Sequence, residues 1–153
     1  YSAYNHSSKF GWEHSSFEAA IESEIERINL MNDKPELKIN NIDPVNFLQF
    51  SYLRHGHYAS NLENWFNYFG KNQFMHFSIE DLDQNYDKIM NSLFVFFNLS
   101  EINLKKEDRK NIGVGKGKYP PMNEKTRDFL IDYYKPHNKK LYNLIGQKFD
   151  WDK

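Results

Sequence analysis

The chain has 153 residues, enough for one domain with a packed core. Its formal net charge is −1, so no global basic field points to nucleic acid as a partner. It contains no cysteine, which excludes disulfides and cysteine-ligated zinc and favours a reducing compartment, so we expect a cytoplasmic protein. No apolar run is long enough to cross a bilayer.

The first third of the chain is predicted to be mainly helical. Residues 1–8 are polar and aromatic and suit the end of a helix. Ser15 and Glu18 have the spacing of a capping box, which introduces an amphipathic helix over residues 16–31. The apolar positions of this helix recur at helical spacing: Phe17, Ile21, Ile25 and Ile28.

Three further helices are predicted in the middle of the chain. Pro44 suits the first turn of a short helix that reaches Tyr52, and a turn containing Gly56 follows it. Gly70 ends the next helix, whose apolar positions are Leu62, Trp65, Phe66 and Phe69. A third helix covers residues 86–97, with Ile89, Leu93 and Phe97 on one face.

Residues 73–78 form a short apolar run with polar flanks, which we interpret as a buried strand. A single strand cannot satisfy its own backbone groups, so we expect partner strands upstream of Tyr1. The predicted class is therefore α/β, with this portion mostly helical around one short strand. We expect residues 1–153 to form a single domain that is the C-terminal part of a longer one.

Residues 113–121 read Gly-Val-Gly-Lys-Gly-Lys-Tyr-Pro-Pro and form the most distinctive segment. Glycine lets the backbone approach a ligand closely, and exposed N–H groups together with lysine ammonium groups attract an anion. The segment is either a phosphate-binding loop or a surface turn with solvated lysines. After it, Asn123 suits the N-cap of a last helix, which Pro136 should kink or split.

Four motifs, in this order, resemble the C-terminal half of sulfotransferases that use 3′-phosphoadenosine 5′-phosphosulfate (PAPS), above all the heparan-sulfate type and its bacterial relatives. They are Tyr1-Ser2-Ala3-Tyr4, Ser16-Phe17-Glu18-Ala19-Ala20, the run from Gly56-His57-Tyr58 through Trp65 to Glu80-Asp81-Leu82, and Lys116-Gly117-Lys118-Tyr119-Pro120 with the helix after it. The resemblance implies a P-loop-like fold, with a parallel sheet flanked by helices. It also implies an enzyme that transfers a sulfuryl group from PAPS to a hydroxyl or amine of a glycan or small molecule, without a metal.

The resemblance also implies roles for individual residues. The nucleotide donor would be held by Ser2, Lys116, Gly117, Lys118 and Tyr119, and His6 would lie near the acceptor as a catalytic base. The acceptor itself would meet His55, His57 and Tyr58. A structural interpretation stays open for each of these, with Ser2 and His6 as solvated side chains and the other two histidines as exposed turn residues.

The sequence also departs from the family pattern. Lys118 stands where the family has arginine, which keeps the charge but loses the bidentate fork, and Asn111 stands where a cysteine is common. The Lys-x-Gly-Thr loop and the catalytic glutamate are not found in the sequence, and we expect both upstream of Tyr1.

Two other functions remain open from the sequence. The alternative is a non-enzymatic helical interaction module in which the glycine-rich segment is only a turn. A P-loop phosphotransferase is disfavoured because the chain has no Gly-x-x-x-x-Gly-Lys-Ser/Thr motif. The sequons Asn5-His6-Ser7 and Asn98-Leu99-Ser100 leave the Golgi lumen as the alternative compartment.

Overall fold

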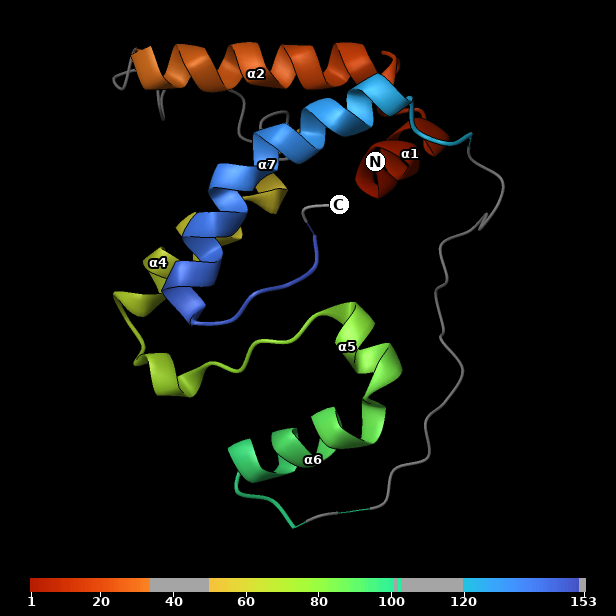
Figure 1. Ribbon diagram of the computed structural model, residues 1–153. Helices are drawn as coiled ribbons and strands as arrows, with labels where there is room; N and C mark the ends of the chain where they lie inside the picture. The colour runs from red at the N-terminus through yellow and green to blue at the C-terminus, as the bar shows by residue number, and fades with distance from the viewer. Residues whose placement is uncertain (34–49, 101, 103–119, 152–153) are drawn as a thin grey trace.

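The computed structural model describes residues 1–33, 50–100, 102 and 120–151 (Figure 1). In these ranges the helical elements are α1 (Ser2–Lys9), α2 (Phe17–Asp33), the 3₁₀ turn η2 (Arg54–Gly56), α4 (Tyr58–Phe66), the 3₁₀ turn η3 (Lys71–Gln73), α5 (Ile79–Gln84), α6 (Tyr86–Phe96) and α7 (Glu124–Ile145). In Figure 1, α2 lies across one end of the molecule and α7 runs down from it beside α4. The short helices α5 and α6 lie at the opposite end.

Several predicted helices are confirmed, with shifted boundaries. The helix expected over residues 16–31 is α2, but it starts after Ser16, whose hydroxyl oxygen accepts the N–H of Ala19 at 3.2 Å. Glu18 does not close the predicted capping box, because the N–H of Ser15 donates to the Glu13 carboxylate at 2.9 Å. The Glu18 carboxylate instead accepts the hydroxyl of Thr126 at 3.0 Å. The helix α4 ends at Phe66, before Gly70.

The C-terminal helix α7 begins where the sequence predicts it. The Asn123 side chain accepts the N–H of Lys125 at 2.9 Å and so caps the first turn. The helix continues through Pro136 to Ile145, so the expected split does not occur. Gly146, at φ 69°, ends it in the left-handed conformation that glycine adopts most readily. The helix expected from Pro44 lies mostly outside the described residues.

The strand predicted over residues 73–78 is wrong, and so is the predicted α/β class with its parallel sheet. Among the described residues none lies in a strand, and the segment starts with η3 instead. Its backbone is nevertheless extended at both ends, with φ/ψ of −121°/137° at Phe74 and −87°/162° at Ser78. An extended run becomes a strand only where another pairs with its N–H and C=O groups, and no described segment does so here.

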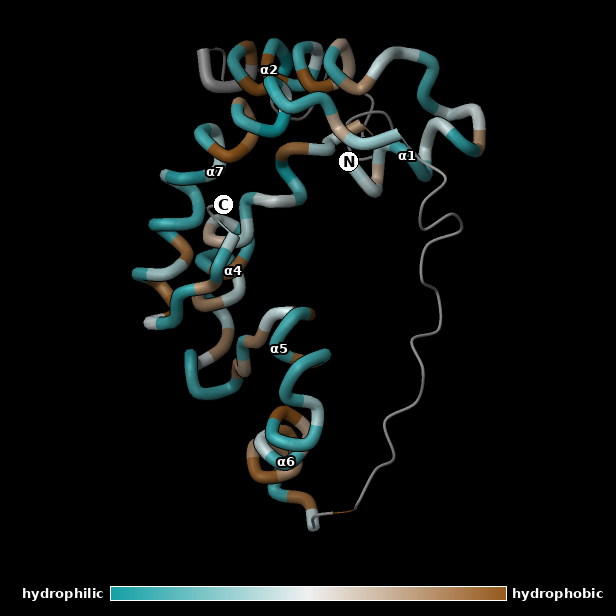
Figure 2. The backbone as a smooth tube through the Cα atoms, turned by 45° about the vertical axis from the view of Figure 1, so that its right-hand side comes forward, coloured by the Kyte–Doolittle hydropathy of each residue, from teal (hydrophilic) through white to brown (hydrophobic). Residues whose placement is uncertain are grey.

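The core lies where α1, α2 and α7 meet the segment before η2. Its buried centre is formed by Phe17, Ile21 and Leu53. Around this centre pack Tyr1, Tyr4, Ile25, Tyr52, Met122, Leu130, Tyr133 and Tyr134. Figure 2 shows hydrophobic and hydrophilic bands alternating along α2 and α7, the pattern of helices with one buried face. No described helix is both long and apolar enough to span a membrane.

Candidate functional site

The start of α1 is joined to Pro120, a residue in the last part of the glycine-rich segment. The Tyr1 hydroxyl donates a hydrogen bond to the carbonyl oxygen of Pro120 at 2.7 Å. The Tyr1 ring is also held edge-on against Phe17, with ring centroids 4.9 Å apart. Ser2, the first residue of α1, is exposed next to this joint. The remaining predicted donor-binding residues, Lys116, Gly117, Lys118 and Tyr119, lie outside the described residues.

A buried carboxylate on α2 fixes the turn that carries the predicted acceptor residues. Glu24 is only 1% exposed and accepts the N–H of Leu53 at 2.7 Å and the N–H of Arg54 at 3.0 Å. A buried charge is tolerated when donors of this kind surround it, and charge-assisted hydrogen bonds are the stronger ones. The turn η2 is therefore anchored to α2 at its first residues.

The helix α7 holds the same turn from the other side. The Tyr134 hydroxyl donates to the carbonyl oxygen of Leu53 at 2.8 Å, and burial raises the pKa of this hydroxyl, which keeps it protonated as a donor. A Cβ atom at Gly56 would lie 2.6 Å from Cε1 of the Tyr134 ring. Only glycine allows the backbone of η2 to approach the ring so closely.

An open pocket of about 420 Å³ lies between η2, the start of α4 and α7. Of the predicted acceptor residues, His55 and Tyr58 line it, and both are exposed. Arg127 and the buried Asn138 line it from α7. The rest of the lining is Tyr52, Gly56, Met122, Leu130, Ile131, Tyr134 and Trp151. A guanidinium, an imidazole and an amide beside apolar walls suit a polar ligand or an anion.

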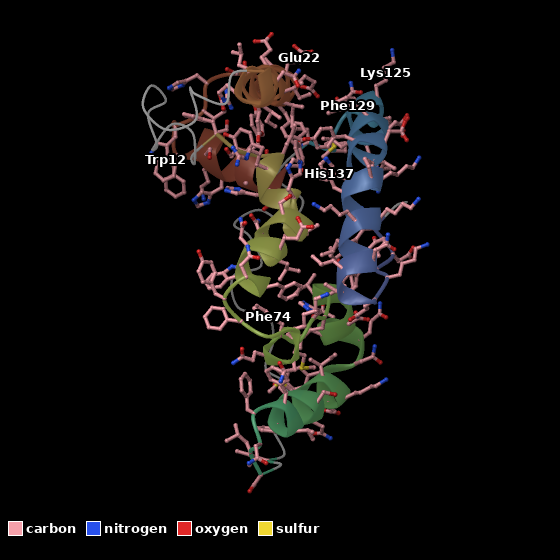
Figure 3. The ribbon with its side chains drawn as sticks, turned by 90° about the vertical axis from the view of Figure 1, so that its left-hand side faces the viewer. Trp12, Glu22, Phe74, Lys125, Phe129 and His137 are labelled. Carbon is pink, nitrogen blue, oxygen red and sulfur yellow. The ribbon has the colours of Figure 1, made fainter. Side chains whose placement is uncertain are left out.

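His57, the third predicted acceptor residue, belongs to a different cluster. Its ring stacks on that of His137 with centroids 4.0 Å apart, and its Nε2 lies 2.9 Å from the Tyr133 hydroxyl oxygen. Burial, together with the nearby His137 and Arg54, lowers the pKa of His57 to about 4. The pKa of His137 is also lowered, by burial and by Lys140. Both rings are therefore neutral at pH 7 and serve as a packed joint between α7 and the start of α4, where Figure 3 shows His137.

The predicted catalytic residue His6 is not brought to the pocket. Its ring packs against Phe10 and Trp12, with centroids 4.8 Å and 6.0 Å away, and it is not among the lining residues. In Figure 3, Trp12 lies at the side of the molecule away from α7. The structure thus brings His55 and Tyr58 to one pocket and bonds Tyr1, the neighbour of Ser2, to Pro120, but it leaves His6 away from the pocket.

Several lining residues were missed at the sequence level. Arg127, Ile131, Tyr134 and Asn138 are spaced along one face of α7, so helical periodicity could have grouped them. Trp151 had no such signal, since it reaches the pocket only because the chain turns at Gly146. Within the described part of the chain, no group of three or more histidine or carboxylate side chains is placed to hold a metal ion.

Comparison with known proteins finds relatives that are sulfotransferases. No family model and no solved structure matches the chain. The membrane-associated sulfotransferase kil1 of Dictyostelium discoideum is 28% identical over 102 residues, which are 67% of this chain and 21% of that protein. Carbohydrate sulfotransferase 15 of Homo sapiens is 29% identical over 128 residues, which are 74% of this chain and 20% of that protein.

A third relative is heparan sulfate glucosamine 3-O-sulfotransferase 6 of Mus musculus. It is 28% identical over 123 residues, which are 67% of this chain and 36% of that protein. The chain therefore spans about a fifth to about a third of the length of these relatives.

Proposed function

We propose that this chain, which belongs to the sulfotransferase family, is part of an enzyme that transfers a sulfuryl group from PAPS to a hydroxyl or amine. The observation that carries the proposal is the match to sulfotransferases over 67% to 74% of the chain. Two of the relatives are named for carbohydrate or heparan sulfate glucosamine, so a glycan hydroxyl is the acceptor that their names favour.

The joint between Tyr1 and Pro120 supports a donor site at the start of α1. Ser2 is the first residue of α1 and follows Tyr1, whose hydroxyl bonds to Pro120 inside the glycine-rich segment. A serine hydroxyl and the free N–H groups of a first helical turn are suitable donors to a phosphate oxygen. We propose that they bind the 3′-phosphate of the nucleotide together with Lys116 and Lys118.

The pocket beside η2 supports an acceptor site. In sulfuryl transfer, negative charge develops on the bridging oxygen of the leaving nucleotide, and fixed cations and N–H groups lower the barrier. Arg127 carries a fixed cation in the pocket lining, and His55 presents an imidazole that can accept a proton from an acceptor hydroxyl. We therefore place the acceptor-facing histidine at His55 rather than at His6.

Binding of adenosine 3′,5′-bisphosphate, the nucleotide product of PAPS-dependent transfer, tests the donor site directly. We expect this ligand, and not ATP, to raise the melting temperature of the chain. Lys116→Ala should raise the dissociation constant roughly 10- to 100-fold, since a charge-assisted contact contributes about 1.5–3 kcal/mol. Lys139→Ala, at an exposed position on α7, is the matched control and should bind as the unchanged chain does. No response to either nucleotide would favour the non-enzymatic interaction module.

A further inference from the structure

A second pocket, of about 680 Å³, lies between α4, α7, residues 75–80 and the last described residues. Tyr58 and Trp151 line both pockets, and their ring centroids are 5.9 Å apart. The second pocket therefore borders the first, and on α7 its lining residues Leu141 and Ile145 continue the same helix face towards the C-terminus. Most of its lining is apolar, and includes Leu62, Trp65, Met75, Phe77, Ile145 and Phe149.

The charges around the second pocket differ from those around the first. Among the residues that line it there is no lysine or arginine, whereas Arg127 lines its neighbour. Its ionisable side chains are Tyr58, His76 and Glu80, and burial lowers the pKa of His76, so that this ring is neutral at pH 7. Glu80 is the one acidic residue of the lining. An anion entering this pocket would find no cation to replace its lost hydration.

One polar group of the lining, the Ser78 hydroxyl, is already engaged within the protein. The Ser78 hydroxyl is 2.8 Å from the Asp81 carboxylate and caps α5. No buried side-chain nitrogen or oxygen in the described part of the chain lacks a hydrogen-bond partner. A ligand in this pocket would therefore meet no unpaired buried polar atom, and most of its contacts would be with apolar side chains.

The aromatic side chains of the lining are only partly covered by the protein. The rings of Phe149 and Trp151 stack with centroids 4.5 Å apart, and Phe149 is buried. Trp65, by contrast, is 55% exposed, and Phe77 is 36% exposed. Contact between these exposed rings and an aromatic ligand would be favourable, because it buries apolar surface and allows edge-on or offset stacking.

We propose that this second pocket binds an uncharged aromatic molecule or group. The volume lies within the range of small-molecule sites. The lining contains no lysine or arginine, its one acidic residue is Glu80, and aromatic rings form much of its wall. The chemistry of the pocket therefore complements a neutral ring system. The proposal concerns a site separate from the acceptor pocket and does not depend on the sulfotransferase reaction.

Fluorescence of N-phenyl-1-naphthylamine, an uncharged aromatic probe, tests the proposal. We expect saturable binding of one probe per chain, with energy transfer from the two tryptophans of the lining, Trp65 and Trp151. Trp12 is not in the lining, so Trp12→Phe should keep most of the transfer, whereas Trp65→Phe combined with Trp151→Phe should remove most of it. Transfer that depends on Trp12 instead would overturn the assignment.

A charge placed in the wall separates the pocket from general surface hydrophobicity. Ile79 lines the pocket and is 55% exposed, so Ile79→Lys should leave the fold intact and raise the dissociation constant of the probe about 10-fold or more. Val95→Lys is the matched control, because Val95 is 73% exposed on α6 and does not line the pocket. Circular dichroism checks that both variants keep their helices. A further variant with a charge in the pocket wall is Ile145→Lys, which should also weaken probe binding.

Three results would overturn the proposal. The first is non-saturable binding, or an equal loss of binding in the Val95 variant, because the probe would then report exposed apolar surface. The second is displacement of the probe by a heparin-derived disaccharide, which would make the site one for anions. The third is a stable dimer on size-exclusion chromatography that excludes the probe, since the occupant would then be a second copy of the chain.

Discussion

Tyr1 and Pro120 are joined by a hydrogen bond of 2.7 Å, although 119 positions separate them in the chain. Tyr1→Phe removes this bond and keeps the ring that packs against Phe17. We expect unfolding to become about 0.5–1.5 kcal/mol easier, as for a single neutral hydrogen bond, and adenosine 3′,5′-bisphosphate to bind several-fold more weakly. Urea unfolding and calorimetric titration measure the two effects.

The control for this substitution is Tyr68→Phe, which removes a hydroxyl from a tyrosine that is 82% exposed. It should change neither quantity. If Tyr1→Phe lowers the stability but leaves nucleotide binding unchanged, the hydrogen bond between Tyr1 and Pro120 is structural only and does not support a nucleotide site at Ser2.

Gly56 and the Tyr134 ring are in contact so close that a single methyl group should disturb them. In Gly56→Ala the new Cβ would lie 2.6 Å from Cε1 and 2.8 Å from the hydroxyl oxygen of Tyr134. We expect a loss of about 1–3 kcal/mol in the free energy of unfolding, the usual result of overpacking. In the Tyr134→Ala background the same substitution should lose most of that effect, because the obstructing ring is gone. Equal losses in both backgrounds would show that the cause lies elsewhere in the turn.

The elements that the sequence predicted well are those that depend on local signals. Asn123 starts α7 as predicted because capping involves only the next few residues. The strand predicted over residues 73–78 does not form, because a strand needs a partner strand, and no local pattern supplies one. The apolar pattern there predicts a buried strand, yet Phe77 is 36% exposed.

The candidate site shows the same division. The order of the motifs predicts His55 and Tyr58 as acceptor residues, and both line a pocket. It does not predict Arg127, the cationic residue of the same lining. The role of Glu24 was also missed, since in sequence it is one of several acidic residues of an amphipathic helix. Only the tertiary structure shows that it faces the N–H groups of Leu53 and Arg54.

Glu24 is the next residue to test, because its carboxylate serves two backbone donors at once. Glu24→Gln offers a single acceptor oxygen and an NH₂ group in place of the second oxygen. One of the two N–H groups then loses its acceptor in a buried site, and we expect a loss of about 1–3 kcal/mol in the free energy of unfolding. Glu22→Gln, at an exposed position of α2 that Figure 3 labels, is the matched control and should have little effect. Equal stability of the two variants in urea unfolding would show that Glu24 does not hold the turn.

The histidine joint predicts how stability changes with pH. The pKa of His57 falls from 6.5 to about 4 on folding, mainly through burial, with His137 and Arg54 as the facing groups that lower it further. Above pH 6.5 the ring is neutral in both states, so it adds no pH dependence. Between pH 6.5 and pH 4 the unfolded chain binds a proton that the folded chain does not, so the stability contributed by the neutral ring is lost as the pH falls.

We therefore expect the melting temperature to fall between pH 7 and pH 5, and to fall less in His57→Asn than in the unchanged chain. His137 adds to the fall in the same direction, since its pKa is lowered too, so the double variant with His137→Asn should show the flattest profile. His14→Asn, at an exposed histidine outside the joint, should keep the full pH dependence. Differential scanning calorimetry at both pH values gives the comparison. A His57 ring whose pKa is lowered on folding must contribute to this fall. If His57→Asn shows the same fall as the unchanged chain, other groups carry the pH dependence and the pKa of His57 is not lowered on folding.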